Sequence, residues 1–490
     1  MESVYTPLRM AKEIYAMQND GKKKRGRKPV FSANQFYPWS VEMQVKELVS
    51  SMLMENGKRL KEAALLGYQA DGLEDVNETD IFVPSDIKEK SEKIFREVEN
   101  FSSRKLDEFA EKTVGRTLGY IPNQAKIRDD FVNNFVANCK SAAENQKKDI
   151  ANAVYAHRMF PDGKKGCLSK EINDINKKYT KSKANFIARN ETGNLNGSIQ
   201  HSQIEGAGFE MYTWMCMPDG VTRDSHKALN GKVCRWDDPT VYSDDGGKTW
   251  QKRTGSMLIG EPGQDFNCRC TAVPFDPELD EDYSVKEMPE EEPEEKEYVK
   301  NFEETLEKKS EEFAIELKKA EEKVFESTYP QTDEEKLAKA KASGLYTEKE
   351  LNELWPAFLA DENNYKINRE KQNRHIVGKY EYNYQNEKNQ KKDEKYRTVG
   401  QSFYDSDFDI YSEIKKYVGT GVLIFDINGI NPPRETVKLL REIGFAGEKK
   451  FVMTDVISIR YSVSGIHAVP VHPNKYKEDI EYVKKTKKSR

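Results

Sequence analysis

Residues 276–297, DPELDEDYSVKEMPEEEPEEKE, constrain the fold of this chain more than any other segment. Acidic residues and proline dominate the segment, and sequence of this kind cannot bury enough apolar surface to form a core. The 490 residues are also too many for a single core and predict three or four structural units. We therefore predict that 276–297 is an acidic linker between a body and a C-terminal region.

Charge is distributed unevenly on the two sides of this linker. The net charge of −5 divides into about +4 over 1–275, roughly −9 over 276–300, roughly −7 over 301–370 and about +7 over 371–490. A basic end that follows an acidic stretch indicates a separately folded module with an anionic partner.

Hydropathy and cysteine usage restrict the class of protein. The longest apolar run, near Val422–Phe425, is too short to cross a membrane. The N-terminal residues lack the basic-then-apolar order of a secretory signal. Six cysteines in 490 residues do not make a disulfide framework. The sequence therefore predicts a protein without a membrane segment that is made and kept in a cytoplasm, or packed into a particle assembled there.

The N-terminal part divides into an arm over 1–37 and a helical region over 38–180. The arm has a predicted helix at 1–20 and a basic block, whose clustered cations suit contact with nucleic-acid phosphates such as those of DNA. An equally good interpretation of the block is a solvated loop. In the helical region, apolar residues recur every three to four positions, and His157 is expected to be a surface or capping residue. The basic block consists of Lys22, Lys23, Lys24, Arg25, Arg27 and Lys28.

The segment 181–275 changes from helical to turn-rich sequence. A helix is expected to end near Gly206, before a strand with Tyr212 and Trp214. Glycine, aspartate and proline dominate the rest, which predicts a small α+β unit rich in turns.

A histidine and a closely spaced cysteine pair stand in this segment. His226 precedes Cys268 and Cys270 by about forty residues, and imidazole and thiolate are ligands of structural zinc. Cys216 or Cys234 would supply a fourth ligand. The alternative is that these cysteines only pack a turn-rich core. No glutamate stands beside His226 as in an HExxH motif, so catalytic zinc is not expected.

After the linker, 298–355 is predicted to be a helical spacer, because apolar residues recur at helical spacing among alternating Glu and Lys. The last domain, 356–490, is predicted to be α+β with an antiparallel sheet. Its expected elements are helices near 407–417 and over 433–443, a strand over 421–427, and a hairpin of 451–462 with 466–472.

Three of the six histidines, His375, His467 and His472, lie in the last quarter of the chain. Metal-independent RNA cleavage needs a base for the ribose 2′-hydroxyl, an acid for the leaving 5′-oxygen, and cations for the phosphorane. Lys371 and Arg374 stand beside the first of these histidines. The alternative is that these polar residues only face solvent. Alternation within 451–462 would place on one face, near His467, the side chains of Thr454, Ser458, Arg460 and Ser462.

Three motifs in 181–275 carry a resemblance: RNET at 189–192, RDSH at 223–226 and NCRC at 267–270. With them the segment resembles the Mu F-like, or minor head protein, domain of tailed phages. The resemblance implies a virion component that associates with portal and capsid proteins, and some members bind DNA. Many members have His-Pro where this sequence has Asp265-Phe266, so no additional ligand is expected there. The matching positions are Arg189, Glu191, Thr192, Trp214, Asp219, Arg223, His226, Gly231, Pro262, Cys268, Arg269 and Cys270.

A second resemblance lies in the last domain, on KQNRHIVG at 371–378, YVGTG at 417–421 and ISIRYSVSGIHAVPVHP at 457–473. These motifs resemble a polymorphic toxin type 50 domain, a family predicted to be a ribonuclease of the barnase, EndoU, colicin and RelE-like group and found attached to Mu F-like proteins. The resemblance implies RNA as substrate, no metal cofactor for its cleavage, and an immunity protein as partner. The matching positions are Lys371, Gln372, Arg374, His375, Ser462, Gly465, His467 and Pro470.

Roles follow from the chemistry of these side chains. We assign acid–base work to His375 and His467, without deciding which is the acid. Phosphate binding falls to Lys371 and Arg460, with Arg374 as a further nucleic-acid contact. Thr454 or Ser462 would position the phosphate, and His472 is expected to be a bystander.

The sequence thus predicts a multidomain α+β protein of a phage head that carries a toxin ribonuclease. It would reside in the virion, and in the host bacterial cytoplasm during assembly and after delivery. No enzymatic activity is expected for 1–355. The rival hypothesis is a purely structural head, DNA-packaging or ejection protein whose C-terminal module is inert.

Overall fold

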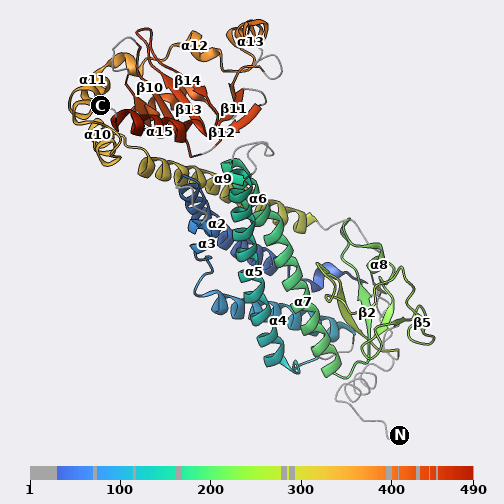
Figure 1. Cartoon of the computed structure of the whole chain (residues 1–490). Helices are drawn as coiled ribbons and strands as arrows, with labels where there is room; N and C mark the ends of the chain where they lie inside the picture. The colour runs from blue at the N-terminus through green and yellow to red at the C-terminus, as the bar shows by residue number, and fades with distance from the viewer. Residues whose placement is uncertain are drawn as a thin grey trace. The chain divides into compact units, whose positions relative to one another are not determined.

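The computed structural model describes residues 30–69, 74–113, 117–159, 168–277, 284–285, 293–392, 400–406, 408–425, 431–440, 442–447 and 451–488 (Figure 1). The helix predicted over 1–20 and the basic block, Lys22 to Lys28, lie outside these residues. None of the described helices is both long and apolar enough to cross a membrane.

The chain forms two compact units, each built from three stretches of sequence. The first unit comprises Met1–Asn56, Ile81–Glu144 and Lys177–Glu312. The second unit comprises Gly57–Asp80, Asn145–Asn176 and Phe313–Arg490. Three long helices contribute residues to both units: α2 (Trp39–Gln69), α5 (Gln124–Met159) and α9 (Pro293–Thr328). The domain boundaries expected from composition stay predictions.

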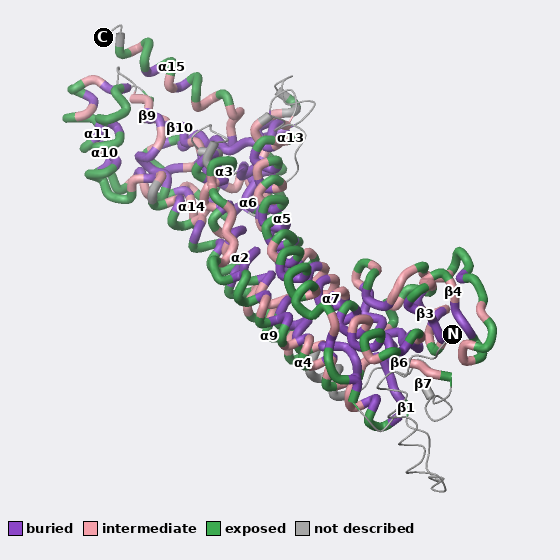
Figure 2. The backbone as a smooth tube through the Cα atoms, turned by 90° about the horizontal axis from the view of Figure 1, so that it is seen from below, coloured by how far each residue is buried: buried purple, intermediate pink, exposed green. Residues whose placement is uncertain are grey.

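Helices form most of the first unit, as the three-to-four residue spacing of apolar residues in the region 38–180 predicted. Beside parts of α2 and α5, the unit contains α4 (Ile87–Thr113) and α7 (Ala184–Gly206), which pack against each other. In α4 the buried residues recur at helical spacing, and Figure 2 shows buried and exposed positions alternating along the helices. The remaining short pieces are η1 (Ala33–Phe36), η3 (Tyr179–Lys183), and β1 (Val30–Phe31), which pairs in parallel with β7 (Ser284–Val285).

A three-stranded antiparallel sheet completes the first unit. Its strands lie in the order β3 (Val233–Arg235), β2 (Met211–Met215) and β6 (Thr271–Phe275). The strand predicted around Tyr212 and Trp214 is therefore confirmed, and both rings are fully buried in the core. The short helix α8 (Asp224–Lys227) and the pair β4 (Val241–Tyr242) and β5 (Gln251–Lys252) lie in the turn-rich remainder.

Two antiparallel sheets form the centre of the second unit (Figure 1). One has the order β14 (His467–Pro470), β13 (Val456–Arg460), β10 (Arg434–Lys438) and β9 (Val422–Ile424). The other has the order β12 (Phe451–Thr454), β11 (Gly444–Gly447) and β8 (Phe403–Tyr404). Helix α15 (Lys475–Lys488) packs against β9 and β10. The α+β fold class expected for the whole chain is confirmed.

Helices surround these sheets. The helical spacer expected after the linker contains α9 and α10 (Asp333–Ala342), which a capping box at Thr332 and Glu335 begins. The other helices of the second unit are α3 (Glu74–Glu78), α6 (Leu168–Lys178), η4 (Glu350–Leu354), α11 (Trp355–Ala360), η5 (Glu362–Tyr365), α12 (Arg369–Asn373), α13 (Tyr380–Lys392), α14 (Ile410–Glu413) and η7 (Ile414–Tyr417).

Two expectations for the last domain are wrong. The helix predicted over 433–443 is instead strand β10, which hydrogen-bonds to β9 on one side and β13 on the other. The stretch 451–462 is not one strand, because a break at Asp455 places β12 and β13 in different sheets. The hairpin itself is present, with Arg460 opposite His467 across β13 and β14.

His157 is buried, contrary to its expected surface position. Its Nδ1 lies 2.6 Å from a carboxylate oxygen of Glu442, and its Nε2 lies 2.8 Å from one of Glu171. Burial lowers the pKa of His157, but the bonds and charges of Glu442 and Glu171 outweigh burial, so the pKa is raised from 6.5. Within the second unit, this bridge joins α5 and α6 to the strand region near β11.

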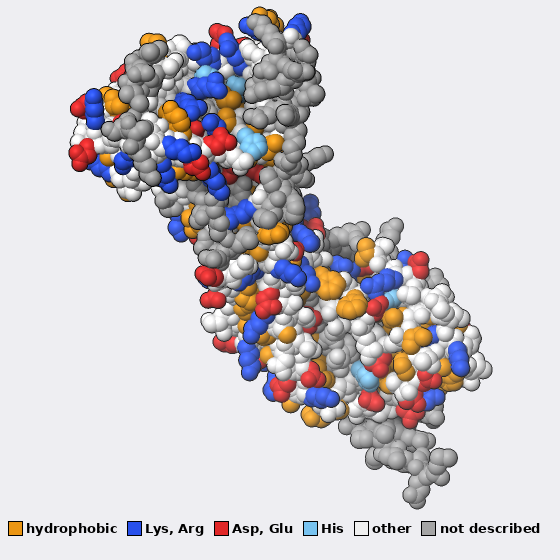
Figure 3. Space-filling model, in the orientation of Figure 1, with side chains coloured by type: hydrophobic (Ala, Val, Ile, Leu, Met, Phe, Trp, Pro, Cys, Tyr) orange, Lys and Arg blue, Asp and Glu red, His pale blue; other side chains and the backbone are white. Residues whose placement is uncertain are grey.

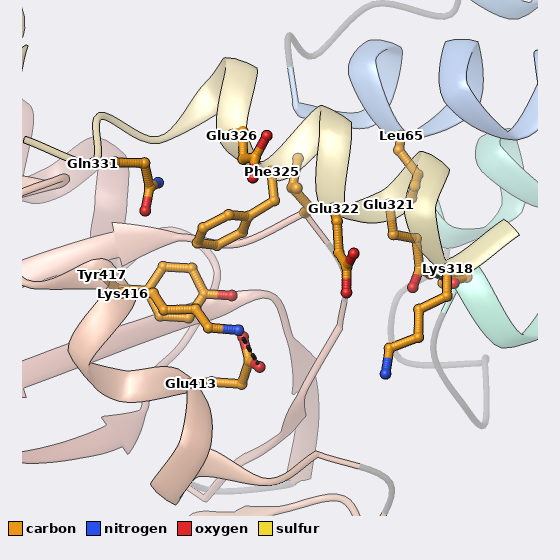
Figure 4. Close-up of a pocket in the computed structure, with 12 residues that line it drawn as sticks. Leu65, Lys318, Glu321, Glu322, Phe325, Glu326, Gln331, Glu413, Lys416 and Tyr417 are labelled. Carbon is orange, nitrogen blue, oxygen red and sulfur yellow. Dashed lines mark hydrogen bonds and ion pairs between the residues drawn. The ribbon is translucent and has the colours of Figure 1, made fainter. Parts of the chain in front are cut away.

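The part of helix α9 that belongs to the second unit lies beside a cavity of about 440 Å³. Figure 4 shows Phe325 of α9 and Tyr417 of η7 facing each other, and their ring centroids lie 5.4 Å apart. The pair Lys416–Glu413 lies next to them, with a Nζ–Oε distance of 2.8 Å. Glu321 pairs with the buried Lys61 at 3.0 Å. Apolar side chains, such as Phe325 and Tyr417, therefore line this cavity together with charged side chains that are partly paired with one another.

We predict that Glu442→Gln lowers the unfolding free energy of the second unit by about 3 kcal/mol, because it leaves a buried histidine with one partner fewer. Since the pKa of folded His157 is raised, the bridge stabilises fully below pH 6.5 and is lost as pH rises through the folded pKa. Unfolding monitored at pH 6 and pH 8 should therefore show a larger effect at pH 6. The matched control is Glu413→Gln, which removes a partly exposed pair with Lys416 and should cost less than about 1 kcal/mol. Equal losses for both variants would contradict the prediction.

Candidate functional site

Two histidines from distant segments meet in the second unit. His375 follows α12 directly, and His467 begins β14. Their rings are nearly parallel, with an angle of 13° between the planes and 6.4 Å between the centroids. His375 is buried and His467 is half-buried. The structure therefore brings together the two imidazoles that the sequence assigned to acid–base work.

Gln372 positions this pair. Its side-chain amide donates to the Ala468 carbonyl oxygen at 3.1 Å and accepts from the Ala468 amide at 2.8 Å. This two-point bond attaches the last turn of α12 to β14, one residue after His467. Gln372 is fully buried. The resemblance included Gln372 but gave it no role, and nothing local in the sequence indicates its partner.

Cationic side chains surround the histidines. Arg460 is exposed and lies opposite His467 in the β13–β14 register, so both side chains project from the same face of the sheet. Lys371 approaches Ser462, with 3.4 Å between Nζ and Oγ. Arg374 forms an ion pair with Glu370, with 2.8 Å between Nη2 and Oε1. On the face seen in Figure 3, histidine side chains reach the surface among Lys and Arg side chains.

The environment keeps both imidazoles uncharged near neutral pH. The Nδ1 of His375 lies 3.0 Å from the Ser402 carbonyl oxygen, and because a carbonyl only accepts, Nδ1 carries the proton and Nε2 is unprotonated. Burial lowers the pKa of His375 to about 4, with the Ser402 bond opposing and Arg460 and Arg374 assisting. Burial and the charges of its neighbours, His375 and Arg460 first, lower the pKa of His467 to about 3. Its Nδ1 is buried and has no hydrogen-bond partner among the described residues.

Thr454 was expected at the site, whereas His472 was expected to be a bystander. Thr454 ends β12, is buried, and donates from Oγ1 to the Val471 carbonyl oxygen at 2.5 Å, so it stabilises the break at Asp455. The Nδ1 of His472 accepts a hydrogen bond from the Asn474 amide at 3.2 Å. Among the described residues, no contact between its ring and the rings of His375 and His467 is recorded. Because of the break at Asp455, Thr454 and Arg460 lie in different sheets. The alternation of side chains along 451–462 therefore does not place them on one face.

The second candidate site lies in the first unit, around His226 of α8. Its Nδ1 is 3.5 Å from the Cys268 sulfur and 3.4 Å from the Cys270 sulfur, and the three ligand atoms lie within 4.8 Å of one another. The Cys216 sulfur is 3.8 Å from that of Cys270. Cys234 is buried elsewhere, near the carbonyl of Lys232. Of the two cysteines considered as a fourth ligand, Cys216 is the one beside this cluster.

Neighbouring residues fix the orientation of the His226 ring. Nε2 lies 3.1 Å from a carboxylate oxygen of Asp265, which also binds Arg223. Asp265 orients a ligand-type histidine through the ring nitrogen that faces away from the sulfurs. Hydrogen bonding to Cys270 and burial raise the pKa of Cys268, so its thiol is neutral unless a cation is close.

Helix α7 holds the loop that carries the cysteines. At Gly193 and Gly197 the helix touches this loop directly, because an added Cβ would lie 2.2 Å from the Cys268 carbonyl oxygen and 2.4 Å from that of Pro262. Arg269 pairs with Asp219 and lies over the Trp39 ring, 4.6 Å from its centroid. Several motif residues between 189 and 270 therefore attach helix α7, the loop with the cysteines and the sheet to one another.

We predict that Gly193→Ala lowers the apparent melting temperature of the full chain, since its methyl group overlaps a backbone oxygen that cannot move without shifting Cys268. Overpacking of this kind costs about 1–3 kcal/mol. The control is Gly220→Ala, whose Cβ would meet nothing within 4 Å. Thermal unfolding followed by circular dichroism checks both variants. A loss for Gly220→Ala as large as that for Gly193→Ala would refute the argument.

Comparisons with known proteins cover both candidate sites. Residues 143–273 match the family model described as Phage Mu protein F like protein, and residues 367–470 match the one described as Bacterial toxin 50. A protein of Haemophilus influenzae described as an uncharacterized protein is 30% identical over 107 residues, which are 22% of this chain and 20% of that protein. The chain thus spans about a fifth of that relative's length. No solved structure matches.

The first family match contains His226 and both cysteines beside it, and the second contains the two stacked histidines. The chain therefore joins a domain of the Phage Mu protein F-like family to a domain of the Bacterial toxin 50 family.

Proposed function

We propose that the C-terminal domain is an endoribonuclease that cleaves RNA by transphosphorylation, without a metal cofactor. The observation that carries this proposal is the His375–His467 pair, whose rings lie 6.4 Å apart beside Arg460 and Lys371. Two imidazoles at that separation can flank one phosphodiester, and the guanidinium and ammonium groups can bind its oxygens.

The reaction divides between the two histidines. The neutral one takes the proton of the ribose 2′-hydroxyl as O2′ forms its bond to phosphorus. The protonated one donates its proton to O5′ as the P–O5′ bond breaks, which leaves a 2′,3′-cyclic phosphate. Arg460 and Lys371 stabilise the charge that gathers on the non-bridging oxygens. Ser462, 3.4 Å from Lys371 Nζ, orients that ammonium group.

The low histidine pKa values set a condition on this mechanism. In the free protein both rings are neutral at pH 7, so nearly every molecule has a neutral imidazole that can act as the base, whereas few molecules have a protonated imidazole that can act as the acid. The fraction of molecules with one protonated histidine then decreases about tenfold for each pH unit above 5. We infer that kcat/KM, which reports the free enzyme, increases toward acid pH.

We predict that full-length protein cleaves RNA in the presence of EDTA and that His375→Ala and His467→Ala each lower the rate by about 10²–10⁴-fold. Cleavage is followed on a labelled oligoribonucleotide, with the cyclic phosphate detected at the new 3′ end. The wild-type rate should increase as pH falls from 7.5 to 5.5. Gln372→Ala should also lower the rate, because α12 loses its bond to β14.

The matched control is His472→Ala, which removes a histidine outside the pair and should keep full activity. A wild-type protein that is inert toward RNA would instead support the rival function, a structural head protein with an inactive module. A rate maximum near pH 7 with both histidines required would contradict the pKa argument but not the catalytic assignment.

For the rest of the chain we propose a minor head protein that resides in the virion and associates with portal and capsid proteins. The support is the Phage Mu F-like match over 143–273. In this proposal the ribonuclease acts in the host bacterial cytoplasm after delivery, an immunity protein protects the producing cell, and the block from Lys22 to Lys28 contacts DNA.

We also propose that His226, Cys268 and Cys270 hold a structural zinc ion, with Cys216 as the fourth ligand. Tetrahedral zinc, with bonds of about 2.3 Å to sulfur and about 2.0 Å to nitrogen, has nitrogen–sulfur edges of roughly 3.5 Å and sulfur–sulfur edges of roughly 3.8 Å. The corresponding distances of 3.4, 3.5 and 3.8 Å agree with those edges. All three cysteines and the histidine are buried, so the ion would stabilise the turn-rich loops and perform no chemistry.

We predict one zinc ion per chain by elemental analysis of purified protein, and its loss in Cys268→Ser. Removal of the ion by a chelator should lower the melting temperature of the first unit, since the site then contains neutral thiols in place of four metal bonds. The control is Cys234→Ser, which lies outside the cluster and should retain the metal. Metal-free protein with the wild-type melting temperature would refute the proposal.

A further inference from the structure

The two imidazoles of the candidate active site each have one ring nitrogen held in the interior. The Nδ1 of His375 donates to the Ser402 carbonyl oxygen at 3.0 Å. The Nδ1 of His467 is buried without a hydrogen-bond partner among the described residues. In both rings Nε2 is therefore the nitrogen that remains for a substrate. The partner at Nδ1, or its absence, decides whether that Nε2 presents a lone pair or a proton.

Strand β8 and the residue before it hold His375 at two points. The His375 carbonyl oxygen accepts from the Tyr404 amide at 3.0 Å, and the ring donates to Ser402. Ser402 is fixed in turn, because its Oγ accepts from the Gly447 amide at 2.9 Å. With the proton at Nδ1, the neutral His375 ring presents the lone pair of Nε2. When Nε2 takes up a proton, the bond to Ser402 becomes charge-assisted and strengthens, as a general base requires.

His467 has the opposite arrangement. Buried N–H groups without an acceptor are rarer than buried acceptors without a donor, so the neutral ring is expected to carry its proton at Nε2. A second proton has to enter at the buried Nδ1. Burial, and then the charges of His375, Arg460, Lys371 and Arg374, lower the pKa of His467 to about 3, against about 4 for His375. A protonated His467 is therefore the stronger acid of the two.

A bound phosphodiester favours the protonated form of His467. Arg460 lies opposite His467 in the β13–β14 register, so a phosphate held by Arg460 adds negative charge beside this ring. An opposite charge nearby stabilises an imidazolium. The pKa of His467 is therefore expected to be higher in the complex with RNA than in the free protein, and the acid forms where the phosphate binds.

We propose that His375 is the general base and His467 the general acid, so that the attacking ribose binds beside His375 and the leaving nucleotide beside His467. This inference rests on the proposed ribonuclease function and adds the direction of the RNA strand. The Nε2 of His375 takes the 2′-hydroxyl proton as O2′ bonds to phosphorus. The Nε2 of His467 gives its proton to O5′ as the P–O5′ bond breaks, which leaves a 2′,3′-cyclic phosphate and a free 5′-hydroxyl. Ser402 is a positioning residue, since its carbonyl acts through His375.

The test compares two substrates that differ in one atom of the leaving group. The cleavage site is first mapped on RNA with full-length wild-type protein. Two oligonucleotides then contain that site, one with the natural 5′-oxygen and the other with a bridging 5′-sulfur. A thiol, with a pKa of about 8.5, is far more acidic than an alcohol, so the sulfur leaves without a proton from the protein.

Loss of the acid should matter only for the oxygen substrate. His467→Ala should lower the rate on that substrate by about 10²–10⁴-fold and return to within about tenfold of the wild-type rate on the sulfur substrate. His375→Ala should be slow on both substrates. His375→Asn should also be slow on both, although its amide can still donate to Ser402 and keep the segment in place.

The pH dependence gives a second measurement. On the sulfur substrate only the neutral base is needed, and the pKa of His375 is about 4. The wild-type kcat/KM should then stay level between pH 5.5 and 7.5, whereas on the oxygen substrate it should rise toward acid pH. Two controls apply to both substrates: Lys371→Ala should slow them by the same factor, and His472→Ala should leave both rates unchanged.

The outcomes separate this assignment from the ribonuclease function itself. Sulfur that restores His375→Ala instead of His467→Ala would overturn the assignment and leave RNA cleavage intact. Restoration of both variants, or of neither, would also overturn it. A wild-type protein that cleaves no RNA would remove the proposed function, and the assignment with it. Wild-type melting temperatures show that the histidine variants are folded.

Discussion

The paired hydrogen bonds between Gln372 and the backbone of Ala468 are the constraint on which the candidate active site depends. They join a short helix to a strand 96 residues away and so place His375 beside His467. A buried amide that satisfies both a donor and an acceptor of one residue leaves little freedom for sliding, because a shift of one position would leave both groups unpaired in the interior. Gln372, which takes no part in the proposed chemistry, thereby fixes the positions of the two segments that carry the histidines.

Burial of the functional side chains is common to both candidate sites, but its chemical consequence differs between them. In the C-terminal domain, burial lowers the pKa of two imidazoles that lie beside cationic side chains, so the neutral form that can accept a proton predominates near pH 7. Around His226, burial brings an imidazole and thiols together with a carboxylate behind the ring, an arrangement that favours a tightly held cation. In each case a helix beside the site contacts the backbone of a strand or loop, α12 through the Gln372 side chain and α7 at Gly193 and Gly197, so small changes in packing reach the functional atoms.

Local sequence predicted several elements without reference to their tertiary partners. The helix α7, the strand β2 and the hairpin of β13 and β14 follow from apolar spacing and turn residues. Strand β10 did not, because its apolar residues suit either a helix or a strand and its pairing partners, β9 and β13, are supplied by tertiary structure. The burial of His157 and the roles of Gln372 and Ser402 were equally invisible, since each depends on a backbone or carboxylate group far away in sequence. The histidines themselves were identifiable because their chemistry, together with a family resemblance, singled them out.

The bridge between His157 and Glu442 spans 285 residues of chain. Because a ribosome releases the N-terminal segment first, the surface of α5 and α6 around this histidine emerges long before its covering strands exist. The second unit therefore cannot complete its core until the chain has been synthesised through Glu442 and the strands that follow it. The candidate active site therefore assembles only after the segment 143–273, which matches the Phage Mu protein F-like family, has left the exit tunnel.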